Sequence, residues 1–182
     1  MVAAADEILA FWLEAGPGKW FAKDEAFDAE IRATLKATHH AAARGELEVW
    51  AQTPKGALAL VLLFDQIGRN IFRGSAHAFA TDPLARTVAR AAIAAGHDRA
   101  VDPSLRSFFY MPFMHSEALA DQDLGVEFFE TLEREGGQSA RWARDHRDII
   151  ARFGRFPHRN AKLGRATTLA EQAFLDAGGF AG

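Results

Sequence analysis

The chain has 182 residues, of which 21 are basic, 24 are acidic and 49% are hydrophobic. This length is enough for one domain with a buried core, and the hydrophobic fraction is that of a folded globular protein. The absence of cysteine excludes disulfides, thiolate nucleophiles and Cys-ligated metal centres, and it is typical of a cytoplasmic protein. The net charge of −3 argues against a general nucleic-acid binder, so any recognition of anions has to be local.

Neither a leader peptide nor a membrane span is predicted. The longest apolar run, residues 57–64, has eight residues, which is far too short to cross a membrane. The N-terminal segment lacks basic residues before its apolar part and contains Asp6 and Glu7, so it does not match a signal peptide. We therefore expect a cytoplasmic protein with no membrane partner.

Helical periodicity dominates the first half of the chain, and no convincing alternating strand pattern is found. A first helix is expected over residues 3–15, before a Gly-Pro-Gly break. Asp24 is expected to cap a second helix, which Gly45 ends. Pro54 should be the first residue of a third helix, which reaches about residue 74.

The second half continues with the same start and stop signals. Asp82 is expected to cap a helix that ends at Gly96, and Thr168 with Glu171 forms a capping box for the last helix. The other expected pieces begin at Pro103 and Pro112 and cover residues 121–135 and 139–153. The pattern predicts an all-α fold of seven to nine helices in antiparallel pairs, forming a single domain over residues 1–182.

Polar side chains interrupt the apolar third helix between residues 65 and 73. Helical spacing places Asp65, Arg69 and Arg73 on one stripe. Gln66 and Asn70 form a second stripe beside it. A guanidinium in apolar surroundings has to find a partner. Two interpretations stay open: a structural ladder of ion pairs, or a pocket wall that presents guanidinium and amide donors to a ligand.

Two further segments supply candidate acid–base residues. His115 and Glu117 are two residues apart, which is about 200° around a helix, so a regular helix cannot aim both at one metal ion. His146 lies close to the apolar stripe formed by Ile149 and Ile150, which makes it a candidate inward-facing histidine. Each of the three polar residues is either a general acid or base or a hydrogen-bonded structural residue. Without cysteine or an H-E-x-x-H motif, no metal or cofactor is predicted.

Positive charge gathers near the C-terminus. Five of the 21 basic residues lie between residues 149 and 170, which contain no acidic residue. Pro157 and Gly164 break this stretch, and an irregular Arg-rich turn can enclose a phosphate or carboxylate because the guanidinium fork binds these anions with two hydrogen bonds. Alternatively, the arginines neutralise acids on neighbouring helices. The candidate ligand-binding residues here are Arg155, His158, Arg159, Asn160 and Arg165.

The chain resembles a bacterial family known as domain-of-unknown-function family 924 over three long motifs: DQIGRNIFRGSAHAFATD (65–82), RSFFYMPFMHSE (106–117) and HRDIIARFGRFPHRNAKLGRATTLAEQAFL (146–175). Residues 20–31 resemble its N-terminal part, and the whole resemblance covers about residues 5–180. It implies a tetratricopeptide-like right-handed array of helix pairs and no particular activity. One difference is Ile67-Gly68, where the family usually has a larger residue followed by proline.

Three functions are compatible with these motifs. The first is binding of an anionic small molecule or peptide through a pocket rich in Arg, His and Asn. The second is a small-substrate hydrolase, with His115 or His146 as general base and the arginines stabilising an oxyanion. The third is a purely structural buried polar network. We favour binding or structure, and the ligand and oligomeric state stay open. We also expect the segment 153–165 to be ordered and to meet the segments 65–73 and 115–117.

Overall fold

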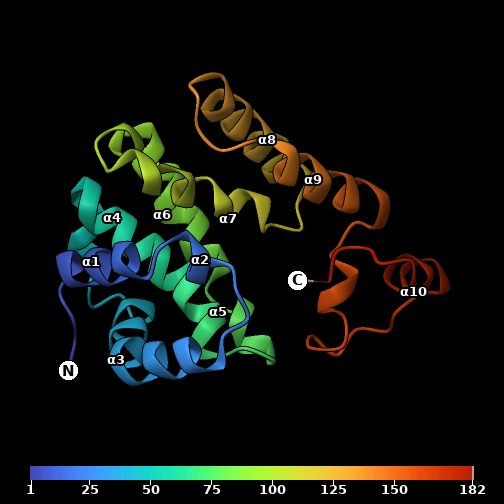
Figure 1. Ribbon diagram of the computed structural model, residues 1–182, viewed down its shortest axis with the longest axis horizontal. Helices are drawn as coiled ribbons and strands as arrows, with labels where there is room; N and C mark the ends of the chain where they lie inside the picture. The colour runs from blue at the N-terminus through green and yellow to red at the C-terminus, as the bar shows by residue number, and fades with distance from the viewer. Residues whose placement is uncertain (182) are drawn as a thin grey trace. The chain divides into compact units, whose positions relative to one another are not determined.

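The structure is a computed structural model that describes residues 1–181 (Figure 1). These residues form helices and turns without any strand, which confirms the all-α prediction. The chain divides into two compact units: one comprises Met1–Arg73 and His77–Pro112, and the other comprises Gly74–Ala76 and the chain from Phe113 onward. That the two behave as one domain stays a prediction. Over residues 1–181, no helix combines the length and the apolar character needed to cross a membrane.

The first unit is built on a buried indole. Trp12 is fully buried, and its ring meets Phe108 edge-on with the centroids 5.8 Å apart. Phe27 packs on the same indole at 6.3 Å, and Trp20 Nε1 donates a hydrogen bond of 2.6 Å to the Trp12 carbonyl. The elements in chain order up to the unit boundary are α1 (Ala5–Ala15), α2 (Pro17–Trp20), α3 (Glu25–Ala43), η1 (Glu48–Gln52), α4 (Pro54–Val61), η2 (Leu62–Ile67), α5 (Gly68–Ile71), η3 (Ala76–Phe79), α6 (Asp82–Ala94), η4 (His97–Arg99), η5 (Pro103–Phe109) and α7 (Met111–Met114).

The predicted caps are correct for α3 and wrong for α6. The Asp24 carboxylate accepts hydrogen bonds of 2.9 and 3.0 Å from the backbone N–H groups of residues 26 and 27, and Gly45 follows α3 with a φ of 82°. The N-cap of α6 is Thr81, and Asp82 is the first residue of the helix. The Asp82 carboxylate accepts two hydrogen bonds from Arg69 instead, because a charged donor binds a carboxylate more strongly than a backbone N–H.

The predicted third helix is divided into α4, η2 and α5. The middle part, η2, is a π-helix in which every residue is buried, and its wider turn changes which carbonyls accept from the helix itself. Side chains of other elements donate to this turn: His39 Nδ1 to the Leu63 carbonyl at 3.0 Å, and Thr81 Oγ1 to the Phe64 carbonyl at 2.7 Å. A Cβ at Gly68 would lie 3.3 Å from the His39 ring, so glycine permits this close packing.

The second unit contains a helical hairpin followed by the basic segment and a short last helix (Figure 1). Its helices are α8 (Leu119–Arg134), α9 (Arg141–Phe153), η6 (Pro157–Arg159) and α10 (Leu169–Asp176). Arg144 pairs with Glu130 and Glu133 near the loop, while Arg147 pairs with Asp123 further along. This order of contacts makes α8 and α9 antiparallel, as predicted for consecutive helices.

The chain after α9 returns across an aromatic core. Ile149, Ile150 and Phe156 are buried, and the rings of Phe153, Phe174 and Phe180 pack against them. The predicted Thr168 capping box is confirmed, since both of its hydrogen bonds are present. A Schellman motif ends α10: the N–H groups of residues 179 and 178 donate to the carbonyls of residues 174 and 175 at 3.0 and 3.1 Å. It directs the last residues back towards α9, where the Phe180 ring contacts His146.

We predict that Thr81→Val lowers the free energy of unfolding by about 1 kcal/mol, because it removes the hydrogen bond to the π-helix carbonyl while keeping the side-chain shape. Thr87→Val is the matched control, since the Thr87 hydroxyl makes a similar bond to the Pro83 carbonyl on an exposed face of α6. Its loss should stay within about 0.5 kcal/mol. Urea denaturation measures both variants, and equal losses would contradict the role given to Thr81.

Candidate functional site

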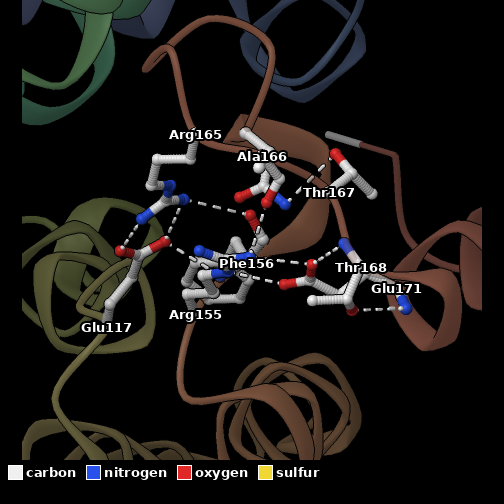
Figure 2. Close-up of polar contacts among 9 residues, drawn as sticks. Glu117, Arg155, Phe156, Arg165, Ala166, Thr167, Thr168 and Glu171 are labelled. Carbon is white, nitrogen blue, oxygen red and sulfur yellow. Dashed lines mark hydrogen bonds and ion pairs between the residues drawn. The ribbon is translucent and has the colours of Figure 1, made fainter.

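The basic segment is ordered and bonded to Glu117, as predicted (Figure 2). The Glu117 carboxylate accepts hydrogen bonds of 2.7 and 2.9 Å from the Arg165 guanidinium and one of 2.8 Å from the Phe156 N–H. Burial alone would raise the pKa of Glu117, but the bonds from Arg165 and Phe156 outweigh it and lower the pKa. Both oxygens of Glu117 are therefore engaged as acceptors.

A second carboxylate, Glu171, holds the other side of the segment (Figure 2). Arg155 donates to its two oxygens at 2.5 and 2.8 Å and also to the Ala166 carbonyl at 2.8 Å. Glu171 is 2% exposed and accepts from the Thr168 N–H at 2.7 Å. The hydrogen bonds from Arg155 hold the pKa of Glu171 far below its usual range. The capping box indicated Glu171 in the sequence, but its pairing with Arg155 depends on the fold.

The remaining candidates of this segment are mostly buried. The Arg159 guanidinium lies over the Phe156 ring at 4.5 Å, and this residue is 6% exposed. Asn160 is fully buried, and its amide donates to the Thr167 hydroxyl at 3.4 Å. Within residues 1–181, His158 Nδ1 and Asn160 Oδ1 are buried without a hydrogen-bond partner.

In the first unit, residues of the two predicted polar stripes bind two carboxylates, Asp82 and Asp28, that were not predicted as their partners. Arg69 forms an ion pair of 3.4 Å with Asp65, as the predicted ladder requires, and a shorter one of 2.8 Å with Asp82. Gln66 Nε2 donates to Asp65 Oδ2 at 2.5 Å. The pairing of Arg69 with Asp82, 13 residues away, is what the helical spacing could not show.

Arg73 and Asn70 both bind Asp28 of α3. The Asn70 amide donates to Asp28 at 2.8 Å, and Arg73 forms two hydrogen bonds with the same carboxylate. Burial would raise the pKa of Asp28, but the bonds from Arg73 and Asn70 outweigh it and lower the pKa. Asp28 lies three residues before Ile31 and seven before Leu35, on an apolar stripe of α3. A carboxylate in that position needs a partner, and this is the sequence signal that was missed.

That the segment 65–73 meets the basic segment stays a prediction.

The candidate histidines of the second unit lie around two phenylalanines. His146 is 5% exposed, and its Nδ1 donates to the Trp142 carbonyl at 2.7 Å, which leaves Nε2 as the acceptor. Its ring centroid lies 6.4 Å from that of His115 and 4.4 Å from that of Phe180. Burial, with smaller electrostatic effects of His115 and Arg159, lowers the pKa of His146 to about 4.

His158 packs on the same aromatic rings. Its centroid lies 5.6 Å from Phe156 and 5.0 Å from Phe180. Burial, together with the neighbouring charges of Arg159 and Lys162, lowers the pKa of His158 to about 3. Both imidazoles are therefore neutral at pH 7. Among residues 1–181, no group of three or more His, Cys, Asp or Glu side chains is arranged to hold a metal ion.

A cavity of about 540 Å³ lies between α9 and the last described residues, and we call it the α9–tail cavity. The Arg152 guanidinium, at its wall, lies over the rings of Phe153 and Phe174 at 4.6 and 5.8 Å. Arg152 is not among the ligand-binding residues predicted from the sequence, although an arginine next to Phe153 was a visible signal. The lining residues are Trp142, Asp145, Asp148, Ile149, Arg152, Phe153, Phe174, Gly178, Gly179, Phe180 and Ala181.

A family model described as "Bacterial protein of unknown function (DUF924)" matches residues 8–179. The chain belongs to the DUF924 family. A solved structure from Agrobacterium tumefaciens, described as a protein of unknown function, is 50% identical to this chain, with a TM-score of 0.90. The match covers 95% of this chain and 97% of that one. No curated protein matches the chain. The DUF924 resemblance seen in the sequence is thus confirmed, while the tetratricopeptide-like arrangement stays a prediction.

We predict that Glu117→Ala lowers the free energy of unfolding by roughly 2–4 kcal/mol, because Arg165 and the Phe156 N–H both lose their acceptor. Glu130→Ala is the control in the same unit, since Glu130 also pairs with an arginine but on a more exposed surface: the side chains of Arg144 and Glu130 are 48% and 37% exposed, against 24% and 28% for Arg165 and Glu117. Its effect should stay below about 1 kcal/mol. Thermal and urea unfolding distinguish the two, and a small effect of Glu117→Ala would show that these bonds contribute little.

We predict that stability falls as the pH decreases from 7 to 4. The pKa of His146 is about 4 in the folded protein against an ordinary value of 6.5, so below pH 6.5 the unfolded chain takes up a proton that the folded protein does not. This loss amounts to roughly 3 kcal/mol by pH 4. Urea denaturation at several pH values should show a weaker dependence for His146→Phe. The same dependence in both proteins would contradict a buried neutral imidazole.

Proposed function

We propose that this protein binds a small molecule that carries one carboxylate on an apolar body, and that the α9–tail cavity is its site. The observation that carries the proposal is the Arg152 guanidinium, stacked on aromatic rings at the wall of this cavity. The volume of about 540 Å³ lies within the range of small-molecule pockets, about 300–1,000 Å³. Aromatic walls with a few polar groups are also typical of such pockets.

The surroundings of Arg152 distinguish it from Arg155 and Arg165, the two arginines that hold the basic segment. Arg155 and Arg165 already direct their N–H groups at the carboxylates of Glu171 and Glu117. A guanidinium that stacks on rings through its flat face keeps the N–H groups along its edge for a carboxylate, which it binds with two parallel hydrogen bonds. Arg152 can therefore act as an anion receptor without breaking an ion pair with either glutamate.

The acids at the edge of the cavity restrict the charge of the ligand. Asp145 and Asp148 line the cavity, and each lies near an exposed arginine, Arg141 at 3.8 Å and Arg147 at 3.6 Å. Two carboxylates beside the Arg152 guanidinium repel a polyphosphate or polyanion more than a single carboxylate. The rings of Trp142 and Phe174 offer contacts to the apolar part. The proposed ligand is thus a monoanion with an apolar body.

Catalysis by His146 has less support from the geometry. Its Nδ1 is directed at a backbone carbonyl, and a pKa of about 4 makes it a weak base near neutral pH, where a general base works best with a pKa near the working pH. Structural pairing is the second function that we propose, for the arginines outside the cavity. The bonds of Arg155 to Glu171 and of Arg165 to Glu117 support it, because each joins the basic segment to another element.

We predict that 3-phenylpropionate binds the protein and that Arg152→Met weakens its binding about ten- to hundredfold, as expected for the loss of a hydrogen-bonded ion pair. Isothermal titration calorimetry and NMR titration measure the affinity. The uncharged 3-phenylpropanamide should bind both proteins equally. Arg134→Met is the matched control, because Arg134 is exposed at the end of α8, donates to the Thr131 hydroxyl and does not line the cavity.

Two results would overturn this proposal. The first is the absence of binding by 3-phenylpropionate and by octanoate, which present a carboxylate on an aryl and on an alkyl body. The second is an equal loss of affinity for the acid and the amide in Arg152→Met, which would show that Arg152 acts through packing and not through its charge.

A further inference from the structure

Phe180 contacts the buried His146 and the half-buried His158, and it lines the α9–tail cavity at the same time. Its ring centroid is 4.4 Å from His146 and 5.0 Å from His158, and it also packs against the core cluster formed by Ile149, Ile150 and Phe156. The same residue belongs to the wall of the cavity. The Phe180 ring therefore separates the cavity from the two imidazoles.

The polar groups behind this ring are incompletely bonded. Within the part of the chain that the structure describes, the Nδ1 atom of His158 is buried and has no hydrogen-bond partner. A buried polar atom in this state destabilises the protein by the cost of its lost hydration. His146 uses Nδ1 for the Trp142 carbonyl, so its Nε2 is the remaining acceptor of that ring. The Phe180 ring offers no hydrogen bond to either imidazole, so another aromatic ring can take its place without the loss of one.

The segment that carries Phe180 is attached through a turn and not through a helix. Gly178 has a φ of 80°, which only glycine adopts readily, and a Cβ on Gly179 would lie 2.5 Å from the Phe174 ring. Phe180 is the first residue after the two backbone hydrogen bonds that Gly178 and Gly179 donate in this turn, and it is not part of α10. Small changes of backbone angles at the two glycines can rotate Phe180 off the histidines without unfolding the helix.

We propose that Phe180 is a replaceable cover over a second subsite, in which a flat aromatic group of the ligand takes the place of its ring. This inference rests on the proposed function, since the same ligand places its carboxylate on Arg152. The space occupied by the Phe180 ring is bounded by His146, His158 and the core cluster. The two imidazoles meet this ring tilted and edge-on at centroid distances of 4.4 and 5.0 Å, a geometry that favours contact with another flat ring. The ligand class is therefore an aryl-substituted carboxylic acid.

Phe180 acts in this arrangement as an internal competitor. The observed affinity for an aryl carboxylate is the affinity of the uncovered subsite multiplied by the fraction of molecules in which Phe180 does not cover it. Removal of the ring should increase the affinity for an aryl ligand, whereas a residue that only forms a wall of the cavity would lower the affinity when it is truncated. The two roles of Phe180 thus predict effects of opposite sign.

The experiment compares 3-phenylpropionate binding by the wild type, Phe180→Ala and Phe180→Leu. We expect Phe180→Ala to bind about tenfold more tightly and Phe180→Leu to lie between, since leucine fills part of the space but is not flat. Octanoate, which lacks a ring, should gain less. Leu169→Ala is the control, because Leu169 is 92% exposed at the start of α10 and lies outside the cavity. Circular dichroism and thermal unfolding establish that each variant is folded.

An NMR titration of the wild type gives a test without mutation. On saturation with 3-phenylpropionate, the ring signals of Phe180 and the Cε1–H signals of His146 and His158 should all shift, because one aromatic ring replaces another beside the imidazoles. Two results would overturn the role of Phe180 as a cover while leaving the proposed function standing. The first is binding by the wild type with unchanged histidine signals. The second is binding by the wild type together with equal or weaker binding by Phe180→Ala. The absence of binding by the wild type and by every variant would overturn both.

Discussion

Two carboxylates, Glu117 and Glu171, fix the basic segment between α9 and α10, and the arrangement of the second unit depends on them. Glu117 accepts from Arg165 and from the Phe156 N–H, and Glu171 accepts from Arg155 and from the N-terminus of α10. Charged hydrogen bonds to acceptors with little exposure are strong, and removing one partner leaves a charge that water cannot fully solvate. The segment thus has a defined path despite its breaks at Pro157 and Gly164.

This pairing also determines which positive charge is left for a ligand. An acidic protein that gathers arginines in one stretch uses two of them to neutralise glutamates of neighbouring elements, while Arg152 lies on the rings of Phe153 and Phe174 in a cavity wall. The arginine proposed to bind a ligand is therefore Arg152, which lies beside aromatic rings, and not Arg155 or Arg165. Phe180 lines the same cavity, and its ring contacts the two neutral histidines.

Much of the helical framework was readable from local signals. The Asp24 cap, the glycine after α3, the Thr168 capping box and the glycines after α10 act within a few residues, so their meaning does not depend on distant parts of the chain. The cap at Asp82 was predicted by the same rule and failed, because Arg69 is a stronger partner for that carboxylate than the helix N-terminus. The π-helix at η2 was equally out of reach, since His39 and Thr81 donate to it from other elements.

The sequence by itself determined the helical class, the family and the residues with chemical potential, because periodicity, capping and long motifs are properties of neighbouring positions. Only the tertiary structure decided which of these residues are partners. The pairs Arg165–Glu117 and Arg73–Asp28 join positions 48 and 45 residues apart. An ion pair at such a separation forms only when the core brings its two elements together, since a side chain recognises a partner by distance and geometry in space. Arg152 became a candidate for the same reason: the returning tail and α9 border a solvent-open cavity beside it.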